Sequence, residues 1–222
     1  SALSHIKETY PEYIPCVLLQ MTLVAFSDII QIAREWNSDG LLKSFVLSNI
    51  HGLSPNFING VKTVDYEETK QLYLHILDAY EKHQDWVVLK IFLDECLAYW
   101  KDRPIIDAGQ SVPMATCMPI NSKIYIDSQM QIGICEKVAD KYRIGNVKNG
   151  IDWKRANEIV EEYYHKRVER CKYCPAIRMC DMCLTAVEYS DEQWDILCHN
   201  ERVYAQIFMF LYCEMAERGL IK

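Results

Sequence analysis

The densest cysteine segment of the chain places four thiols within thirteen residues, from Cys171 to Cys183. They form two C-x2-C pairs, Cys171 with Cys174 and Cys180 with Cys183, separated by five residues. A two-residue gap allows both thiols of a pair to reach one metal centre. Thiolates are soft donors, and both zinc and iron-sulfur clusters are commonly held by four of them. The segment therefore predicts a metal site, and its own four residues leave the choice between the two metals open.

Composition and charge limit the class of protein around this site. Ten of the 222 residues are cysteine, half of the chain is hydrophobic, and the formal net charge is -7. The basic residues are scattered, so we expect no nucleic-acid partner. No run of about 18 apolar residues occurs and no signal-like start is present, so we expect a soluble, cytoplasmic protein without a membrane partner. In that reducing compartment, clustered cysteines are expected to bind metal rather than to form disulfides.

Three further cysteines, Cys117, Cys135 and Cys198, flank the dense segment. Together these seven thiols exceed what a single zinc ion uses, which favours two metal centres. A zinc-stabilised interaction module is the alternative, and it would leave three of the thiols unused. A small electron-transfer ferredoxin is a third interpretation, which leaves everything before Pro104 unexplained. The isolated cysteines, which we expect to be small core residues, are Cys16, Cys96 and Cys213.

The first part of the chain alternates strand and helix patterns. An apolar run, a helical pattern that stops at Asp39-Gly40 and a second apolar run predict a parallel strand-helix-strand unit. Two further helices follow, the first with an apolar stripe and the second almost entirely apolar. The expected elements are a strand over 16–24, a helix over 26–36, a strand over 43–50, and helices over 66–82 and 86–100.

The second part has a different pattern, in which alternating isoleucines predict a β-hairpin and longer periodic segments predict helices. We therefore expect a fold of the α/β plus α+β class, divided into residues 1–104 and residues 105–222. The expected elements of the second part are a linker over 101–111, a hairpin that ends at Cys135, a helix capped by Asp152 that extends to about Lys166, and a last helix from near Asp191 to Gly219.

The cysteines and the elements between them follow one order along residues 105–222. That order is Cys117, a hairpin to Cys135, Ile144-Gly145-Asn146-Val147, Cys171-x2-Cys174-x5-Cys180-x2-Cys183, and then Cys198. It resembles the SPASM domain of radical SAM enzymes that modify peptides and proteins. More weakly, Ile6 to Ile50, with Tyr10-Pro11-Glu12-Tyr13 before a strand, is similar to the late part of the partial barrel of these enzymes. The resemblance implies a C-terminal fragment, with a barrel remnant over 1–104 and the SPASM domain over 105–222.

The resemblance also implies two 4Fe-4S clusters with interleaved ligands. The outer cluster would be held by Cys171, Cys174, Cys180 and Cys198, and the inner cluster by Cys117, Cys135 and Cys183. Sulfatase-maturing members carry a further cysteine six residues before the first inner ligand, where this chain has Ser111. The inner cluster would therefore keep an open coordination position, unless Cys96 fills it. The C-x3-C-x2-C motif of the SAM-cleaving cluster does not occur in the sequence, so S-adenosylmethionine is expected to bind only in the missing N-terminal half.

The implied function is the modification of a ribosomally made precursor peptide or protein, with the two clusters relaying electrons and engaging the substrate. An open iron position is the arrangement of maturases that install thioether bridges. Sulfatase maturation, which forms formylglycine, is the alternative, and Glu136 stands where those members have a catalytic aspartate. Two other differences are the two residues, rather than three, between Cys180 and Cys183, and Met130 at the position of a usual turn glycine. No catalytic residue is assigned, and the chain alone is not expected to be active.

Overall fold

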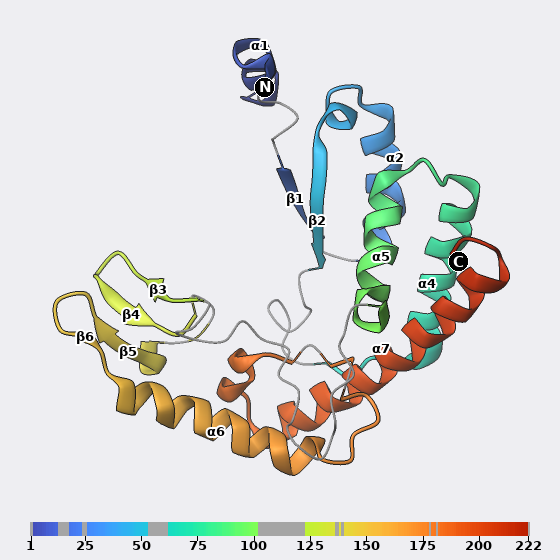
Figure 1. Cartoon of the computed structure of the whole chain (residues 1–222). Helices are drawn as coiled ribbons and strands as arrows, with labels where there is room; N and C mark the ends of the chain where they lie inside the picture. Colours follow the sequence, from blue (N-terminus) through green and yellow to red (C-terminus); the bar gives the residue numbers. More distant parts are fainter. Residues whose placement is uncertain are drawn as a thin grey trace. The chain divides into compact units, whose positions relative to one another are not determined.

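Parallel strands joined by a helix characterise the first part of the protein, and short antiparallel strands followed by long helices characterise the second (Figure 1). The chain divides into two units, one formed by Ser1–Asp102 and Gln206–Lys222 and the other by Arg103–Ala205. The predicted mixture of helix and sheet is confirmed. The predicted boundary between residues 104 and 105 lies outside the described residues. A computed structural model describes residues 2–12, 18–23, 26–52, 62–101, 123–135, 138, 140–177, 179–180 and 182–221.

Two parallel strands form the sheet of the first unit. α2 ends at Ser38 because the Asp39 carboxylate accepts the backbone N–H groups of Leu41 at 2.8 Å and Leu42 at 3.0 Å, which directs the chain into a turn. The predicted strand-helix-strand unit with parallel pairing is confirmed. Its elements are β1 (Leu18–Leu23), η2 (Phe26–Asp28), α2 (Ile29–Ser38), η3 (Leu42–Ser44) and β2 (Val46–Gly52).

Two more helices follow in this unit. They are α4 (Tyr66–Lys82) and α5 (Val87–Lys101), and their bounds agree with the predicted ranges. α4 begins where the Asp65 carboxylate accepts the Glu68 N–H at 2.8 Å. α5 contacts both α2 and β2 (Figure 1). The core residues of these elements include Ile29, Ala33, Trp36, Phe45, Leu47, Tyr73, Ile76, Leu77, Leu89, Phe92, Leu93, Cys96 and Leu97. A short helix, α1 (Ala2–Thr9), precedes β1.

Four short strands in the order β3-β4-β5-β6 form the antiparallel sheet of the second unit. The predicted hairpin corresponds to β3 and β4, whereas the second hairpin, β5 and β6, was not predicted. Its strands come together closely at Gly145, where a Cβ would lie only 2.1 Å from the carbonyl oxygen of Gly150. Only glycine permits that approach. The strands are β3 (Tyr125–Ile126), β4 (Gln131–Gly133), β5 (Arg143–Asn146) and β6 (Gly150–Ile151), with the 3-10 turn η4 (Asp140–Tyr142) before β5.

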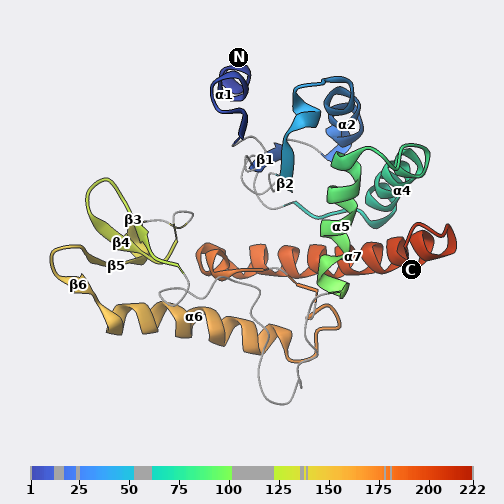
Figure 2. The same ribbon diagram turned by 45° about the horizontal axis from the view of Figure 1, so that its top comes forward.

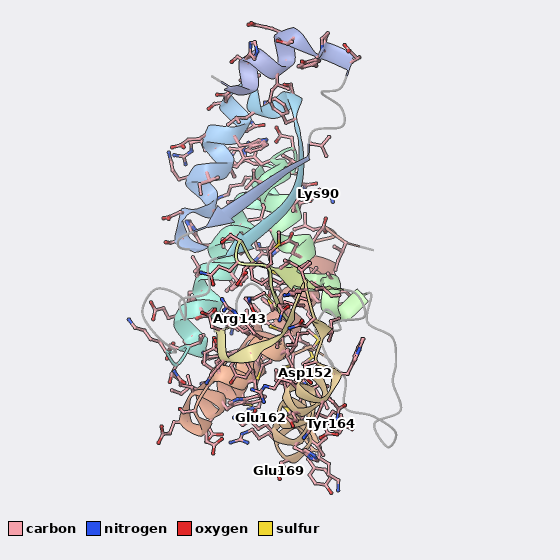
Figure 3. All side chains as sticks on the ribbon, turned by 90° about the vertical axis from the view of Figure 1, so that its left-hand side faces the viewer. Lys90, Arg143, Asp152, Glu162, Tyr164 and Glu169 are labelled. Carbon is pink, nitrogen blue, oxygen red and sulfur yellow. The ribbon has the colours of Figure 1, made fainter. Side chains whose placement is uncertain are left out.

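Two long helices follow the sheet, and the beginning of the second lies beside the first (Figure 2). α6 (Trp153–Cys171) is capped as predicted, because the Asp152 carboxylate accepts the Arg155 N–H at 2.9 Å. It extends beyond the predicted end near Lys166, and its last turn ends at Cys171. η5 (Leu184–Glu188) and α7 (Asp191–Glu217) complete the chain. Glu162, Tyr164 and Glu169 of α6, which are labelled in Figure 3, are exposed.

The core of the second unit joins the sheet to the cysteine segment. Trp194, on the first part of α7, is fully buried, and its indole N–H donates to the Ala186 carbonyl at 2.8 Å. Cys135 and Cys198 pack against this core. Its other buried members are Ile132, Ile134, Tyr142, Ile144, Ala156, Ile159, Tyr163, Cys180, Met182, Leu184, Ala186 and Val187. In the part of the chain that the structure describes, no helix combines the length and apolar character needed to cross a membrane.

The isolated cysteines differ in their positions. Cys96 is buried, as predicted, in α5. Cys213 is exposed, so its assignment to the core was wrong. The buried face of α7 repeats every four residues through Leu211 and Met215, and Cys213 lies midway between them, on the opposite side of the helix. Cys16 lies outside the described residues.

Candidate metal centre

The outer set of predicted ligands is distributed over the end of α6, the segment that follows it, and the second turn of α7. Cys171 is the last residue of α6, and Cys198 lies seven residues into α7. Arg170 holds these two helix ends together, because its guanidinium pairs with Asp191 at 2.9 Å and with Asp195 at 3.7 Å. Arg170 thus links the end of α6, which carries Cys171, to the beginning of α7, which carries Cys198.

Backbone turns shape the segment between the two helices. The N–H of Cys174 donates to the Cys171 carbonyl at 3.0 Å, and the N–H of Ile177 donates to the Cys174 carbonyl at 3.2 Å. The N–H of Cys180 donates to the Ala176 carbonyl at 2.9 Å. A succession of tight turns therefore shapes the described backbone between Cys171 and Cys180.

Three thiols of the outer set influence one another electrostatically. Burial raises the pKa of Cys198 to about 11, and the neighbouring thiolates of Cys171 and Cys174 also raise it. Burial likewise raises the pKa of Cys171, where Arg167 acts in the opposite direction and Cys174 adds to the increase. Burial therefore favours the protonated thiols of Cys171 and Cys198 in the absence of metal.

The buried guanidinium of Arg167 lies beside Cys180, the remaining cysteine of the outer set. The Arg167 side chain is fully buried, its guanidinium donates to the Tyr163 hydroxyl at 3.1 Å and to the Met182 carbonyl at 2.8 Å, and Cys180 is a further hydrogen-bond partner. Although burial lowers the pKa of Arg167, the charges of Tyr163, Cys180 and Cys171 act in the opposite direction and the net pKa is raised. A desolvated guanidinium is stabilised by negative charge nearby, and therefore favours thiolates or an anionic group at these cysteines.

The inner set is described only in part. Cys183 immediately precedes η5, and its charge contributes to the raised pKa of Tyr163, which is due first to burial. Cys135 follows β4, and its Sγ lies 4.0 Å from the Nζ of Lys123. Cys117 lies outside the described residues, as do Ser111 and Glu136. The structure therefore brings Cys180 and Cys183, which the resemblance would assign to different clusters, to the same tyrosine.

The donors fit a thiolate-bound metal group in their chemistry. None of the eight cysteines that the structure describes forms a disulfide. Within these same ranges of the chain, no group of three or more His, Cys, Asp or Glu side chains is close enough to hold a metal ion. The fit rests on the type of donor, soft thiolates, and on the buried guanidinium beside Cys171 and Cys180. The raised pKa values of Cys171 and Cys198 mean that these thiols keep their protons when no metal is bound. A metal that binds them would release these protons, because cysteine ligates as the thiolate.

Sequence reasoning missed Tyr163 and Arg167. The signal was present, because Ile159, Tyr163, Arg167 and Cys171 recur every four residues and therefore share one face of α6. An arginine on the buried stripe of a helix, four residues before a candidate ligand, is unusual enough to indicate a role in the site. The helix had been ended at about Lys166, which separated Arg167 from its own stripe.

One of the departures from the family pattern has a structural counterpart. Met130 has a φ of 60°, which is the left-handed conformation that glycine adopts most easily. Its N–H donates to the Asp127 carbonyl at 3.0 Å, and its own carbonyl accepts the Val147 N–H at 2.9 Å. The hairpin therefore contains a left-handed residue at the position where the resemblance expects a turn glycine.

Comparison with known proteins adds no relative. No family model, no curated protein and no solved structure matches this chain.

Proposed function

We propose that the chain is the C-terminal, auxiliary-cluster region of a radical SAM enzyme that modifies a ribosomally made peptide or protein. Two 4Fe-4S clusters would be bound by the seven clustered cysteines, with Cys171, Cys174, Cys180 and Cys198 as the outer ligands. Cys117, Cys135 and Cys183 would be the inner ligands. Bound in this way, such clusters supply one-electron transfer.

The observation that carries the proposal is a buried arginine, Arg167, beside one cysteine of each C-x2-C pair. Cys171 and Cys180, one from each pair, both act on the pKa of Arg167. Iron-sulfur clusters held by thiolates are anionic, and hydrogen bonds and positive charge near the sulfurs tune their potentials. Arg167 would supply a hydrogen bond and a positive charge at the outer site. Because the side chain is buried, solvent would not screen that charge.

Tyr163 would act between the two ligand sets. Its hydroxyl donates to the Met182 carbonyl at 2.7 Å, and Met182 lies between Cys180 and Cys183 in the sequence. The bond fixes the backbone at the point where the chain would cross from the outer ligands to the inner ones. Tyr163 is thus a positioning residue, since it holds the segment that carries both cysteines.

The first unit supports the partial-barrel part of the proposal. β1, α2 and β2 form a parallel strand-helix-strand unit, which is the repeating unit of α/β barrels. A pair of strands cannot close a barrel, so the unit would complete its sheet with strands supplied by the N-terminal half of the enzyme.

Iron and sulfide analysis of anaerobically purified protein tests the proposal. We expect about eight iron and eight sulfide atoms per chain and a broad brown absorbance, as for two four-iron clusters. Cys171→Ser should lower the iron content by about half. Cys213→Ser replaces an exposed cysteine outside both ligand sets and should retain the full iron content.

The competing zinc-module function predicts a different result. A colourless protein that holds one zinc, retained in Cys135→Ser but lost in Cys171→Ser, would overturn the cluster proposal. Protein purified in air is not a valid sample, because four-thiolate sites that lose iron can bind zinc instead.

A further inference from the structure

β3 is an outer strand of the antiparallel sheet, and one of its two edges is paired with β4 (Figure 1). No strand in the part of the chain that the structure describes pairs with its other edge. An open edge of this kind is a template for another strand unless lysines, a proline or a bulge block it. The edge segment, residues 123–127, has one lysine at its start and no proline, and its pairing with β4 contains no bulge.

The apolar face of the sheet extends as far as this edge. Ile126 lies opposite Ile132, and side chains at opposite positions share a face of the sheet. Ile124, two residues before Ile126, lies on that face as well. Ile132 and Ile134 are buried in the core, whereas Ile124 and Ile126 are 46% and 51% exposed. The hydrophobic face therefore continues past the buried core, and a strand added at the edge would bring further apolar side chains beside these two isoleucines.

The backbone groups of the same two isoleucines point outward. The Asp127 N–H donates to the Gln131 carbonyl at 3.1 Å, which makes these two residues a hydrogen-bonded pair. Along an antiparallel ladder, such pairs alternate with pairs that form no mutual hydrogen bonds, and Ile126 with Ile132 is a pair of the second kind. The N–H and C=O groups of Ile126, and those of Ile124, therefore point away from β4 and toward the open edge.

The edge segment is complementary to itself when two copies run antiparallel. Its sequence is Lys-Ile-Tyr-Ile-Asp, with Tyr125 in the centre. Pairing centred on Tyr125 places Ile124 of each copy opposite Ile126 of the other, where both residues present outward N–H and C=O groups. It also places Lys123 of each copy opposite Asp127 of the other. Apolar pairs and opposite charges at directly opposed positions both stabilise antiparallel strands.

The charges around the edge segment allow a second copy to approach. Nζ of Lys123 lies 4.0 Å from Sγ of Cys135, and Nη2 of Arg143 lies 2.8 Å from the Asp127 carboxylate. Arg143 also pairs with Asp140 at 3.0 Å. The two basic and the two acidic side chains balance one another. Because Asp127 already has a partner, its charge would orient the second copy more than it would strengthen the contact.

We propose that β3 pairs with β3 of a second copy of this chain, antiparallel and in the register centred on Tyr125, so that two 4-stranded sheets become one. The interface is symmetric, so each contact occurs twice. The contact is short, and we expect a dimer that dissociates at roughly 10–100 µM rather than a permanent one. The pairing does not depend on the proposed clusters.

Sedimentation equilibrium of the full chain, from low micromolar to a few hundred micromolar, tests the proposal. Ile126→Lys places a lysine opposite Ile124 twice in each dimer and should weaken association by about tenfold or more. Val147, in the turn between β5 and β6, is also 51% exposed. Val147→Lys is therefore the matched control and should leave the association unchanged.

Two double variants test the register after both isoleucines have been removed. Both contain Ile124→Lys, and the second change is Ile126→Glu in one and Ile126→Lys in the other. The proposed register sets lysine opposite glutamate in the first variant and lysine opposite lysine in the second. We expect the first to associate about tenfold more tightly than the second. Circular dichroism of both should match the wild type, because the replaced side chains are largely exposed.

The outcomes separate the possible occupants of the edge. A wild-type chain that stays monomeric over the whole concentration range would overturn the pairing and leave the edge to a strand of another molecule. A dimer that Ile126→Lys leaves intact would also overturn it, because the copies would then meet elsewhere. Equal association of the two double variants would overturn the register centred on Tyr125.

Discussion

The hydroxyl of Tyr163 and the guanidinium of Arg167 share one acceptor, the carbonyl oxygen of Met182, at 2.7 and 2.8 Å. The two donors are themselves 3.1 Å apart and lie one helical turn from each other on α6. Buried polar groups that are mutually satisfied hold a single arrangement, because breaking one bond leaves the others in an apolar environment. α6 and the backbone between Cys180 and Cys183 are therefore fixed to each other.

Arg167→Met should destabilise the second unit by about 2–4 kcal/mol, because it removes charge-assisted hydrogen bonds from a buried network while keeping most of the side-chain volume. Urea unfolding followed by circular dichroism measures the loss. Lys154→Met makes the same kind of change at an exposed position of α6 and should shift the unfolding free energy by less than about 0.5 kcal/mol.

The same variant gives a second readout at the metal site. If Arg167 compensates the negative charge of the outer cluster, Arg167→Met should retain less iron than Lys154→Met after identical anaerobic purification. Equal iron content in the two variants would show that the arginine serves packing alone.

Much of the fold followed from local patterns, and the failures occurred where tertiary contacts decided the outcome. Asp152 caps the helix that it was expected to cap, because the capping bond is made within one turn. α6 extends past Lys166 with Arg167 on its buried face. The sequence did not predict this, because an arginine is normally expected at the surface. The exposure of Cys213 follows from which face of α7 meets its neighbours.

The second hairpin shows a further limit of sequence reasoning. β5 and β6 are short, and their approach depends on Gly145, whose φ of 147° few other residues adopt. The Ile144-Gly145-Asn146-Val147 segment was recognised as a motif without being assigned to a strand. For the metal site, spacing predicted the candidate ligands, but not the arginine and tyrosine beside Cys180.

Gly145→Ala should lower the unfolding free energy by about 2–3 kcal/mol. The added Cβ would meet the Gly150 carbonyl oxygen at 2.1 Å and the Cα of Ile151 at 3.1 Å, so backbone atoms have to move. The matched variant Gly40→Ala meets nothing within 4 Å and should be close to neutral. Thermal unfolding of the two variants side by side makes the comparison, and equal midpoints would contradict the close approach of β5 and β6.

Cys96 should make the stability of the protein fall at alkaline pH. Burial raises the pKa of its thiol from 9.0 to about 12, so the folded state keeps a proton that the unfolded chain has lost at intermediate pH. The unfolded state then binds fewer protons, and stability decreases as pH rises above the unfolded pKa. Between pH 8 and pH 10 the loss due to this group amounts to about 1.4 kcal/mol.

Comparison with Cys96→Ala isolates this contribution from the other groups that titrate at high pH. Both proteins are unfolded in urea at pH 8 and at pH 10, and the wild type should lose more stability between the two. Parallel losses in the two proteins would mean that the thiol ionises equally in the folded and unfolded states.

Arg218 should stabilise the first unit in a salt-dependent way. Its guanidinium lies 2.7 Å from Asp78, 3.0 Å from Glu81 and 3.1 Å from Glu214, and so joins the end of α7 to α4. Arg218→Met should cost about 1 kcal/mol at low ionic strength, and less in 1 M NaCl, because the pairs are only partly shielded from solvent. Arg34→Met, at an exposed position of α2, should show neither the loss nor the salt dependence.

If the cysteine segment binds metal as proposed, removing the metal should loosen one part of the chain and leave the rest unchanged. Between Cys171 and the start of η5 the described backbone is held by isolated turns, such as those closed at Cys174 and Cys180, rather than by a continuous helix or sheet. Metal-ligand bonds would supply the missing constraint, since the free energy of metal binding stabilises the folded state of such segments. Anaerobic chelation should therefore raise amide hydrogen exchange between Cys171 and Cys198 strongly, while α4 and α5 keep their protection. Exchange that rises equally in both units, or in neither, would show that the cysteine segment does not depend on metal for its structure.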